Sequence, residues 1–190
     1  MILAIDTSAA HCAAALRSDD GQIWVQVETM DKGQAERLMP MIAALLADHH
    51  VAPADLRAVT VGTGPGNFTG IRIGVAAARG LALGLGIPAI GISQFEVLAE
   101  GQPLPCTITL PGNRGQNYRQ SFDADGAPGA PAVVDEGEAI PLPAPALLVQ
   151  QMARMTPARL TSPQPRPAPV YVRAADAAPP RDPAPVILDA

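Results

Sequence analysis

Two short stretches of the sequence contain residue types that could carry out chemistry. Asp6-Thr7-Ser8 places a carboxylate and two hydroxyls directly after an apolar run, and oxygen groups of this kind suit magnesium or phosphate binding. The second stretch, GTGPGNFTG at residues 62–70, contains four glycines and no charge. The candidate residues for binding a nucleotide or another anion are Asp6, Thr7, Ser8, Gly64 and Gly66.

The glycine-rich stretch matches neither of the common phosphate-binding motifs. A Walker A loop requires a lysine, and Gly62, Gly64 and Gly66 give GxGxG where the dinucleotide fingerprint is GxGxxG. A glycine-rich turn that opens a helix remains, and the first-turn amides of such a helix can bind an anion. A tight turn required for packing alone stays equally open, with Asn67 or Thr69 as the helix cap.

The sequence contains few of the residue patterns that other catalytic sites require. A nucleotide-splitting enzyme closes its phosphates between two lobes and needs a second acidic turn. The nearest candidate, DADG at residues 123–126, lacks a preceding apolar strand with hydroxyl residues. The three histidines have neither HxxxH nor HExxH spacing, so no histidine metal site is predicted. His11 and Cys12 are neighbours in a predicted strand and face opposite sides, which excludes a Cys–His dyad.

The first 100 residues must supply the elements that position these groups. Residues 1–6 form a continuous apolar run, which predicts a central strand buried on both faces. Asp20-Gly21 predicts a hairpin turn, and Ser93 and Glu96 predict a capping box for a short third helix. The other predicted elements are strands at 12–17, 22–28, 56–61 and 87–92 and helices at 34–49 and 70–85. The order βββαβαβ predicts an α/β lobe with right-handed parallel crossovers.

Composition changes sharply after residue 100. Four of the 21 prolines lie in residues 1–100 and the other 17 in residues 101–190, and proline removes ladder donors and breaks helices. We therefore expect an N-terminal lobe at 1–100 and a shortened, proline-rich C-terminal lobe and tail at 101–190. The elements expected there are strands at 103–110 and 116–122, a helix at 144–155, and extended or disordered segments at 163–169 and 179–185.

Charge and cysteine content bound the environment and the partners. The net charge is −5 without any run of basic residues, so any contact with nucleic acid is expected to run through a partner. Cys12 and Cys106 form no CxxC pair, and we find no signal peptide and no apolar run of about 18 residues. We expect a cytoplasmic protein with reduced thiols and no membrane contact.

The two long predicted helices are too apolar to be covered by a sheet alone. From Ile71 to Leu85 the only polar side chains are Arg72 and Arg79, and a sheet covers only one side of a helix. Contact between the two helices or an external protein must cover the rest, and Gly70 and Gly74 would permit close approach. The residues expected to share core and interface roles are Leu38, Met39, Ile42, Leu45, Gly70, Ile71, Gly74, Val75, Ala78 and Leu85.

Five motifs, in this order, resemble the bacterial TsaB family. They are AIDTS at 4–8, QAERLMPMI at 34–42, VGTGPGNFTGIRIGVAAARGLALG at 61–84, RGQNY at 114–118 and PVYVR at 169–173. The resemblance is close over the first 100 residues and fragmentary afterwards. It implies an actin-like ATPase fold of two related, ribonuclease H-like lobes, and a role in making threonylcarbamoyladenosine beside the anticodon of tRNAs.

The resemblance also implies what this chain binds. It implies a non-catalytic scaffold without a metal site, which activates a catalytic paralogue, TsaD, through the two long helices and is joined by an ATPase, TsaE. The subunit would need no cofactor, with ATP or ADP and magnesium in the complex, and tRNA would be reached only through the complex. Two alternatives stay open: a stand-alone ATP-dependent kinase or hydrolase using Asp6 and the 62–70 turn, and a homodimer formed by the same helices.

Overall fold

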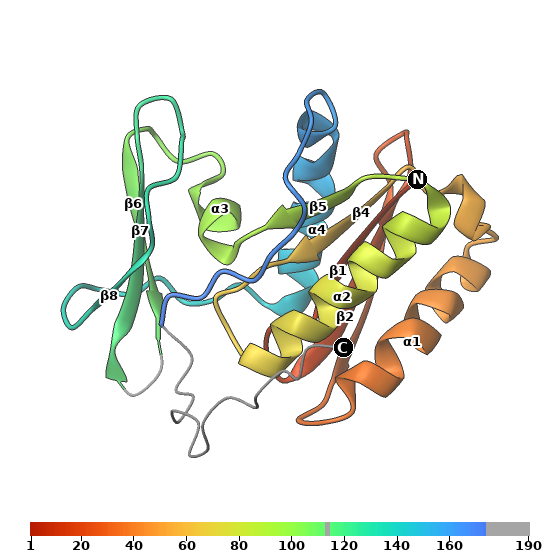
Figure 1. Ribbon diagram of the computed structural model, residues 1–190, viewed down its shortest axis with the longest axis horizontal. Coiled ribbons are helices and arrows are strands. Elements are labelled where there is room, and N and C mark those ends of the chain that lie inside the picture. Colours follow the sequence, from red (N-terminus) through yellow and green to blue (C-terminus); the bar gives the residue numbers. More distant parts are fainter. Residues whose placement is uncertain (113–114, 174–190) are drawn as a thin grey trace, which may run out of the picture.

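The chain forms two β-sheets with helices on both faces of the larger one (Figure 1). The computed structural model describes residues 1–112 and 115–173. The larger sheet consists of β1 (Ile2–Asp6), β2 (His11–Arg17), β3 (Ile23–Thr29), β4 (Ala58–Gly62) and β5 (Ala89–Ile92). Its order is β3-β2-β1-β4-β5, with β1–β3 an antiparallel meander and β1, β4 and β5 parallel. The predicted α/β lobe is therefore confirmed.

Two long helices cover one face of this sheet, and a third long helix covers the other. Helices α1 (Gln34–Asp48) and α2 (Phe68–Leu85) lie side by side on the face seen in Figure 1, with α4 (Pro145–Arg159) behind the strands. The short helices are η1 (Pro53–Asp55) and α3 (Gln94–Ala99). Ser93 and Glu96 form the predicted capping box of α3.

Strand β1 is apolar throughout because both of its faces are covered. Leu3 and Ile5 pack toward α1 and α2, whereas Ile2 and Ala4 pack toward α4. All four side chains are fully buried, since successive residues of a strand point to opposite faces. The prediction of a central strand buried on both faces is confirmed.

Helix α4 comes from the second half of the chain but packs on the first sheet. Its residues Leu148, Val149 and Met152 lie against strands of the larger sheet. The hydroxyls of Thr60 on β4 and Thr156 on α4 are 2.7 Å apart and buried. The strands of the larger sheet therefore all precede residue 100, and those of the smaller sheet follow it. Helix α4, from the second half of the chain, nevertheless packs on the larger sheet.

The second sheet is small and lies beside the first. Its strands are β6 (Cys106–Pro111), β7 (Asn117–Phe122) and β8 (Ala132–Val134), in the order β6-β7-β8. Phe95 of α3 packs against it with Ile108, Leu110, Tyr118 and Phe122. Residues 163–169 contain no helix or strand, in keeping with their prolines. The predicted extended segment at 179–185 lies outside the described residues.

Helix α2 begins two residues earlier than expected because Asn67 caps it. The Asn67 side chain accepts a hydrogen bond from the Gly70 N–H at 2.9 Å, and Gly86 ends the helix with φ of 67°. The expectation of no membrane-length apolar run needs correction, because α2 has 18 residues with a mean hydropathy of 1.3. Its residues Ile71, Val75 and Ala78 pack in the core, and 33% of the segment is buried.

Two glycines of α2 provide a matched test of this packing. A Cβ at Gly70 would overlap the Thr7 carbonyl oxygen, whereas a Cβ at Gly80 would meet nothing within 4 Å. We expect Gly70→Ala to lower the free energy of unfolding by about 1–3 kcal/mol through overpacking. Gly80→Ala should raise it by about 0.5–1 kcal/mol through helix propensity. Urea unfolding of both variants measures the two changes, and equal stabilities would contradict the packing.

The thiol of Cys12 gives a second, pH-dependent prediction. Burial, with a smaller contribution from Glu28, raises the pKa of Cys12 from 9.0 to about 11. The folded state holds the thiol proton more tightly than the unfolded state. The protonated thiol therefore contributes its full stabilisation of the folded state below pH 9.0, and this contribution is lost as the pH rises toward 11. Urea unfolding between pH 9 and pH 11 should show that the free energy of unfolding falls more steeply for the native chain than for Cys12→Ala. Parallel falls would contradict the prediction.

Candidate functional site

Asp6 is the centre of a buried polar cluster at the end of β1. Its Oδ1 accepts hydrogen bonds from the Ser8 N–H at 3.0 Å and the Ser8 hydroxyl at 2.8 Å, and lies 2.8 Å from His11 Nε2. The Ser8 hydroxyl in turn accepts a bond from Gln94 Nε2 at 3.0 Å. All four residues are buried. The cluster ties the turn after β1 to β2 and to the start of α3.

The glycine-rich stretch packs directly on this turn. The Thr7 hydroxyl donates to the Gly70 carbonyl at 2.7 Å, and the Asn67 N–H donates to the Ser8 carbonyl at 2.6 Å. A Cβ at Gly66 would overlap the Ser8 carbonyl oxygen, and Gly64 has φ of 98°. Close packing within the chain therefore explains the glycines at positions 64, 66 and 70, because another segment of the chain lies against each of them.

A cavity of about 570 Å³ opens beside the cluster, between the two sheets. Ser8, Gly66 and Asn67 line one side, and Pro111 and Tyr118 of the second sheet line another. Of the five candidate nucleotide- or anion-binding residues, Ser8 and Gly66 reach this cavity. Asp6, Thr7 and Gly64 lie beneath its wall.

The residues present do not fit a magnesium–nucleotide group. Asp6 is fully buried, and its Oδ2 faces Gly62 without a hydrogen-bond partner among the described residues. The Thr7 hydroxyl and the Gly70 N–H already have partners within the chain. The DADG turn lies at the far end of β7, where Asp123 Oδ1 accepts bonds from its own turn. The groups expected to bind phosphate are thus hydrogen-bonded within the chain, and no chemical step is assigned to them.

Sequence reasoning missed two members of the cluster. The sequence patterns do not connect His11 with Asp6, but His11 begins the strand antiparallel to β1, five residues after Asp6. That hairpin spacing was the available signal. Gln94 lies 86 residues from Ser8 in the chain, and no local pattern connects them. Its Oε1 is buried and has no partner among the described residues.

Most of the expected interface residues prove to face the chain's own sheet. Gly74 lies against Thr7 and Val61, where a Cβ would stand 2.8 Å from Thr7 Oγ1. The close approach at Gly70 and Gly74 is thus made by the chain's own Thr7 turn. Met39 remains exposed and Leu85 half-buried. The residues found in the core are Leu38, Ile42, Leu45, Gly70, Ile71, Gly74, Val75 and Ala78.

The sides of α1 and α2 that point away from the sheet nevertheless carry apolar side chains. Leu83 is 85% exposed and Met39 is 44% exposed. Gly80 and Gly84 are also exposed, and a Cβ at either would meet nothing within 4 Å. We call this surface the outer face, comprising Met39, Ala43, Ala76, Gly80, Leu83 and Gly84. The described residues of the chain leave this surface exposed.

The C-terminal segment covers the start of α2. The Arg72 Nε donates to the Tyr171 hydroxyl at 2.6 Å, and its guanidinium lies 3.7 Å from the centre of the Phe68 ring. The Phe68 and Tyr171 rings are 5.0 Å apart. The Val170 N–H donates to the Thr63 carbonyl at 2.8 Å, which fixes this segment at the end of β4. The outer face therefore begins beyond Arg72.

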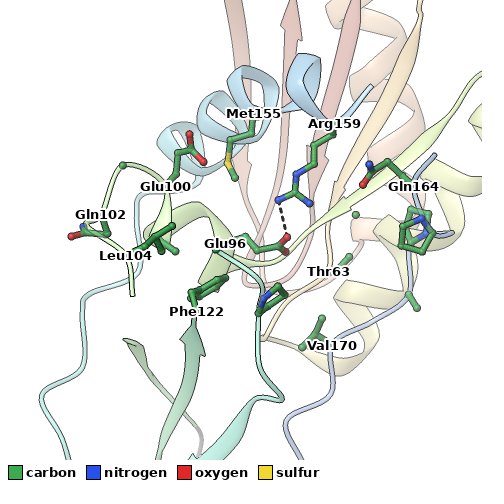
Figure 2. A pocket seen from close by; sticks show the side chains of 18 of the residues that line it. Thr63, Glu96, Glu100, Gln102, Leu104, Phe122, Met155, Arg159, Gln164 and Val170 are labelled. Carbon is green, nitrogen blue, oxygen red and sulfur yellow. Dashed lines mark hydrogen bonds and ion pairs between the residues drawn. The ribbon is translucent and has the colours of Figure 1, made fainter. Parts of the chain in front are cut away.

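A second cavity, of about 760 Å³, lies between α3, the end of α4 and the C-terminal segment (Figure 2). Figure 2 shows Arg159 reaching Glu96, with Arg159 Nη2 and Glu96 Oε1 2.8 Å apart. The other oxygen of Glu96 caps α3 by accepting from the Ser93 N–H at 2.7 Å. Glu96 is therefore held by structural bonds on both oxygens, and its role here is to join α3 to α4.

The Asp6 cluster predicts a clear effect on stability. Asp6→Ala would leave the Ser8 N–H and the His11 ring without their buried partner, so we expect the free energy of unfolding to fall by about 1–3 kcal/mol. Asp31→Ala is the control, because Asp31 is exposed beside the same cavity and should change stability by less than about 0.5 kcal/mol. Chemical unfolding compares them, and an unchanged Asp6→Ala would refute the structural role.

The comparisons with known proteins agree with this architecture. The family described as "TsaD: tRNA N6-adenosine threonylcarbamoyltransferase" matches residues 25–166. The structure of YeaZ from Pseudomonas aeruginosa superimposes with a TM-score of 0.68 over 90% of this chain and 98% of that chain, at 24% identity. This similarity supports the fold, and with the strand order it confirms the expected α/β fold class.

Relatives identified by sequence include two TsaB proteins. The Escherichia coli protein is 40% identical over 100 residues, covering 53% of this chain and 43% of the relative. The Bacillus subtilis protein is 43% identical over 120 residues, covering 62% and 52%. An uncharacterized Mycobacterium tuberculosis protein is 37% identical over 147 residues, covering 73% and 69%.

The chain spans about half the length of the two TsaB relatives that it matches. The family match nevertheless covers residues 25–166, and the mycobacterial relative is matched over 69% of its length. The chain therefore belongs to the family described as TsaD, tRNA N6-adenosine threonylcarbamoyltransferase, and within it is similar to the TsaB proteins.

Proposed function

We propose that this chain is a non-catalytic subunit in tRNA threonylcarbamoyladenosine biosynthesis that binds a TsaD-like catalytic paralogue. The relatives from E. coli and B. subtilis are both named tRNA threonylcarbamoyladenosine biosynthesis protein TsaB, which supports the pathway. In this proposal a TsaE-like ATPase joins through the paralogue, and tRNA is contacted only in the assembled complex. ATP or ADP and magnesium belong to the complex, and the chain acts in the cytoplasm.

The observation that carries the proposal is the apolar outer face of α1 and α2. Leu83 is almost fully exposed, and Met39 is exposed on the neighbouring helix. Burying a leucine of this kind contributes about 1.5–3 kcal/mol, and Gly80 and Gly84 leave room for a foreign helix to approach. An apolar centre with a polar rim is typical of protein interfaces, and Arg72 and Arg79 are exposed charged residues of α2.

The Asp6 cluster supports the non-catalytic part of the proposal. A phosphate-transferring enzyme needs its carboxylate at the substrate, whereas Asp6 is fully buried beneath Ser8 and His11. The first-turn Gly70 N–H of α2 is occupied by Asn67. No specific observation favours the stand-alone kinase or hydrolase, so we propose the scaffold alone.

The same outer face gives the chain a way to self-associate when its partner is absent. A surface that buries apolar side chains against one helix pair can meet its own copy across a two-fold axis. The proposed homodimer and the proposed heterodimer therefore compete for Leu83 and Met39. A single substitution in the outer face should affect both.

Leu83→Glu tests the interface directly. We expect it to weaken binding to the TsaD-like paralogue by at least tenfold, because a carboxylate would replace a buried apolar side chain worth about 1.5–3 kcal/mol. Isothermal titration of the two purified proteins measures the affinity. Sedimentation of the lone variant should also show less self-association.

Leu147→Glu is the matched control for this experiment. Leu147 is 59% exposed on α4, which covers the opposite face of the sheet. Its substitution should leave affinity unchanged. If Leu83→Glu binds the paralogue as tightly as the native chain, while Leu147→Glu weakens binding, the docking surface lies on α4 and the proposal is wrong.

A further inference from the structure

A third concave site lies at the end of the sheet opposite the Asp6 cluster. It is a groove of about 520 Å³ between the C-terminal part of α2, the start of β5, and residues 159–167. Ala89, the first residue of β5, lines it, whereas Asp6 is the last residue of the parallel strand β1. The volume falls within the range of about 300–1,000 Å³ that is common for small-molecule sites.

Among the described residues that line this groove, every charged side chain is an arginine. Arg79 comes from α2, Arg159 from the end of α4, and Arg166 from the C-terminal segment. Neither aspartate nor glutamate is among the described residues that line it. The neighbouring cavity in Figure 2 differs, because Glu96 and Glu100 line it.

Two of these arginines have no acidic partner among the described residues. Arg159 is directed to Glu96 on the side of the Figure 2 cavity. Within residues 1–112 and 115–173, Arg79 and Arg166 make no ion pair. Two guanidinium groups on one groove repel each other, and a ligand that carries negative charge would relieve that repulsion. Because the guanidinium group is a planar fork, it matches phosphate oxygens two at a time.

Most of the remaining lining residues are apolar, and the polar exceptions are Ser162 and Gln164. Leu83 and Ile87 contribute from α2 and the turn after it, and Pro88, Leu160 and Pro163 complete the walls. A bare inorganic ion would leave this surface in contact with water, whereas a ligand with an apolar or planar body would cover it. The groove thus combines unpaired cationic groups with an apolar wall.

We propose that this groove binds a small phosphate ester with an aromatic or apolar body. Arg79 and Arg166 bind the phosphate oxygens, while Leu83 and Ile87 contact the body. The site is separate from the Asp6 cluster, and it shares Gly80 and Leu83 with the α2 part of the outer face. The inference goes beyond the proposed scaffold role, because it concerns a ligand of the isolated chain.

The test is calorimetric titration of the purified full chain with ADP, which offers both a diphosphate and a planar body. We expect a dissociation constant below about 1 mM. Arg79→Gln and Arg166→Gln should each weaken binding by at least about tenfold, because each removes a charge-assisted contact. Arg154→Gln, an exposed arginine of α4 outside the groove, should bind ADP like the native chain.

Parallel titrations with other probes separate the features of the ligand. Inorganic pyrophosphate should bind more weakly than ADP, since it lacks a body, and citrate should bind more weakly than pyrophosphate, since carboxylates replace phosphate. Absence of ADP binding, or binding that both groove variants retain, would overturn the proposal. Binding of tRNA that the variants lose, without binding of ADP, would overturn it in favour of a nucleic-acid surface.

Discussion

Helix α2 approaches the turn after β1 so closely that no side chain fits between them. The Thr7 hydroxyl and the Gly70 carbonyl meet at 2.7 Å, and a Cβ at Gly70 would overlap the Thr7 carbonyl. This contact sets the position of α2 on the sheet. It lies next to Asp6, whose Oδ1 is bonded to Ser8 and His11 and whose Oδ2 faces Gly62. A phosphate or a metal ion at this point would have to displace bonds that the fold uses to hold its own helix.

The position of α2 determines which of its residues serve the core and which remain outside. Ile71, Val75 and Ala78 point to the sheet, while Leu83 and Gly80 point away from it. One stripe of this almost wholly apolar helix therefore packs on the sheet, and the opposite side stays exposed. The helical period determines which residues lie on each side. The C-terminal segment covers the first turn through Tyr171, which leaves the later turns as the outer face.

The second half of the chain completes sites that no local segment contains. Helix α4 closes the far side of the larger sheet, and its Arg159 joins Glu96 of α3. Residues 159–167 then form one wall of the arginine-lined groove, opposite α2. Arg79 lies far in sequence from Arg159 and Arg166, so its place beside them is a property of the packing. Their shared surface lacks a described carboxylate, which distinguishes it from the cavity beside it.

Periodicity and turn chemistry determined the elements of the first 100 residues. The apolar run at β1, the capping box at Ser93 and the order of strands and helices all follow from local patterns, because strand alternation and helix capping act over a few residues. Only the tertiary structure showed which glycines of α2 contact another segment of the chain. Gly70 and Gly80 cannot be distinguished by local sequence, but only Gly70 packs against the Thr7 turn. The tertiary structure also decided that His11 and Gln94 meet at the Asp6–Ser8 turn, and that Arg79 and Arg166 share a groove. Contacts between distant segments depend on how layers pack, and a single sequence does not encode that in any local period.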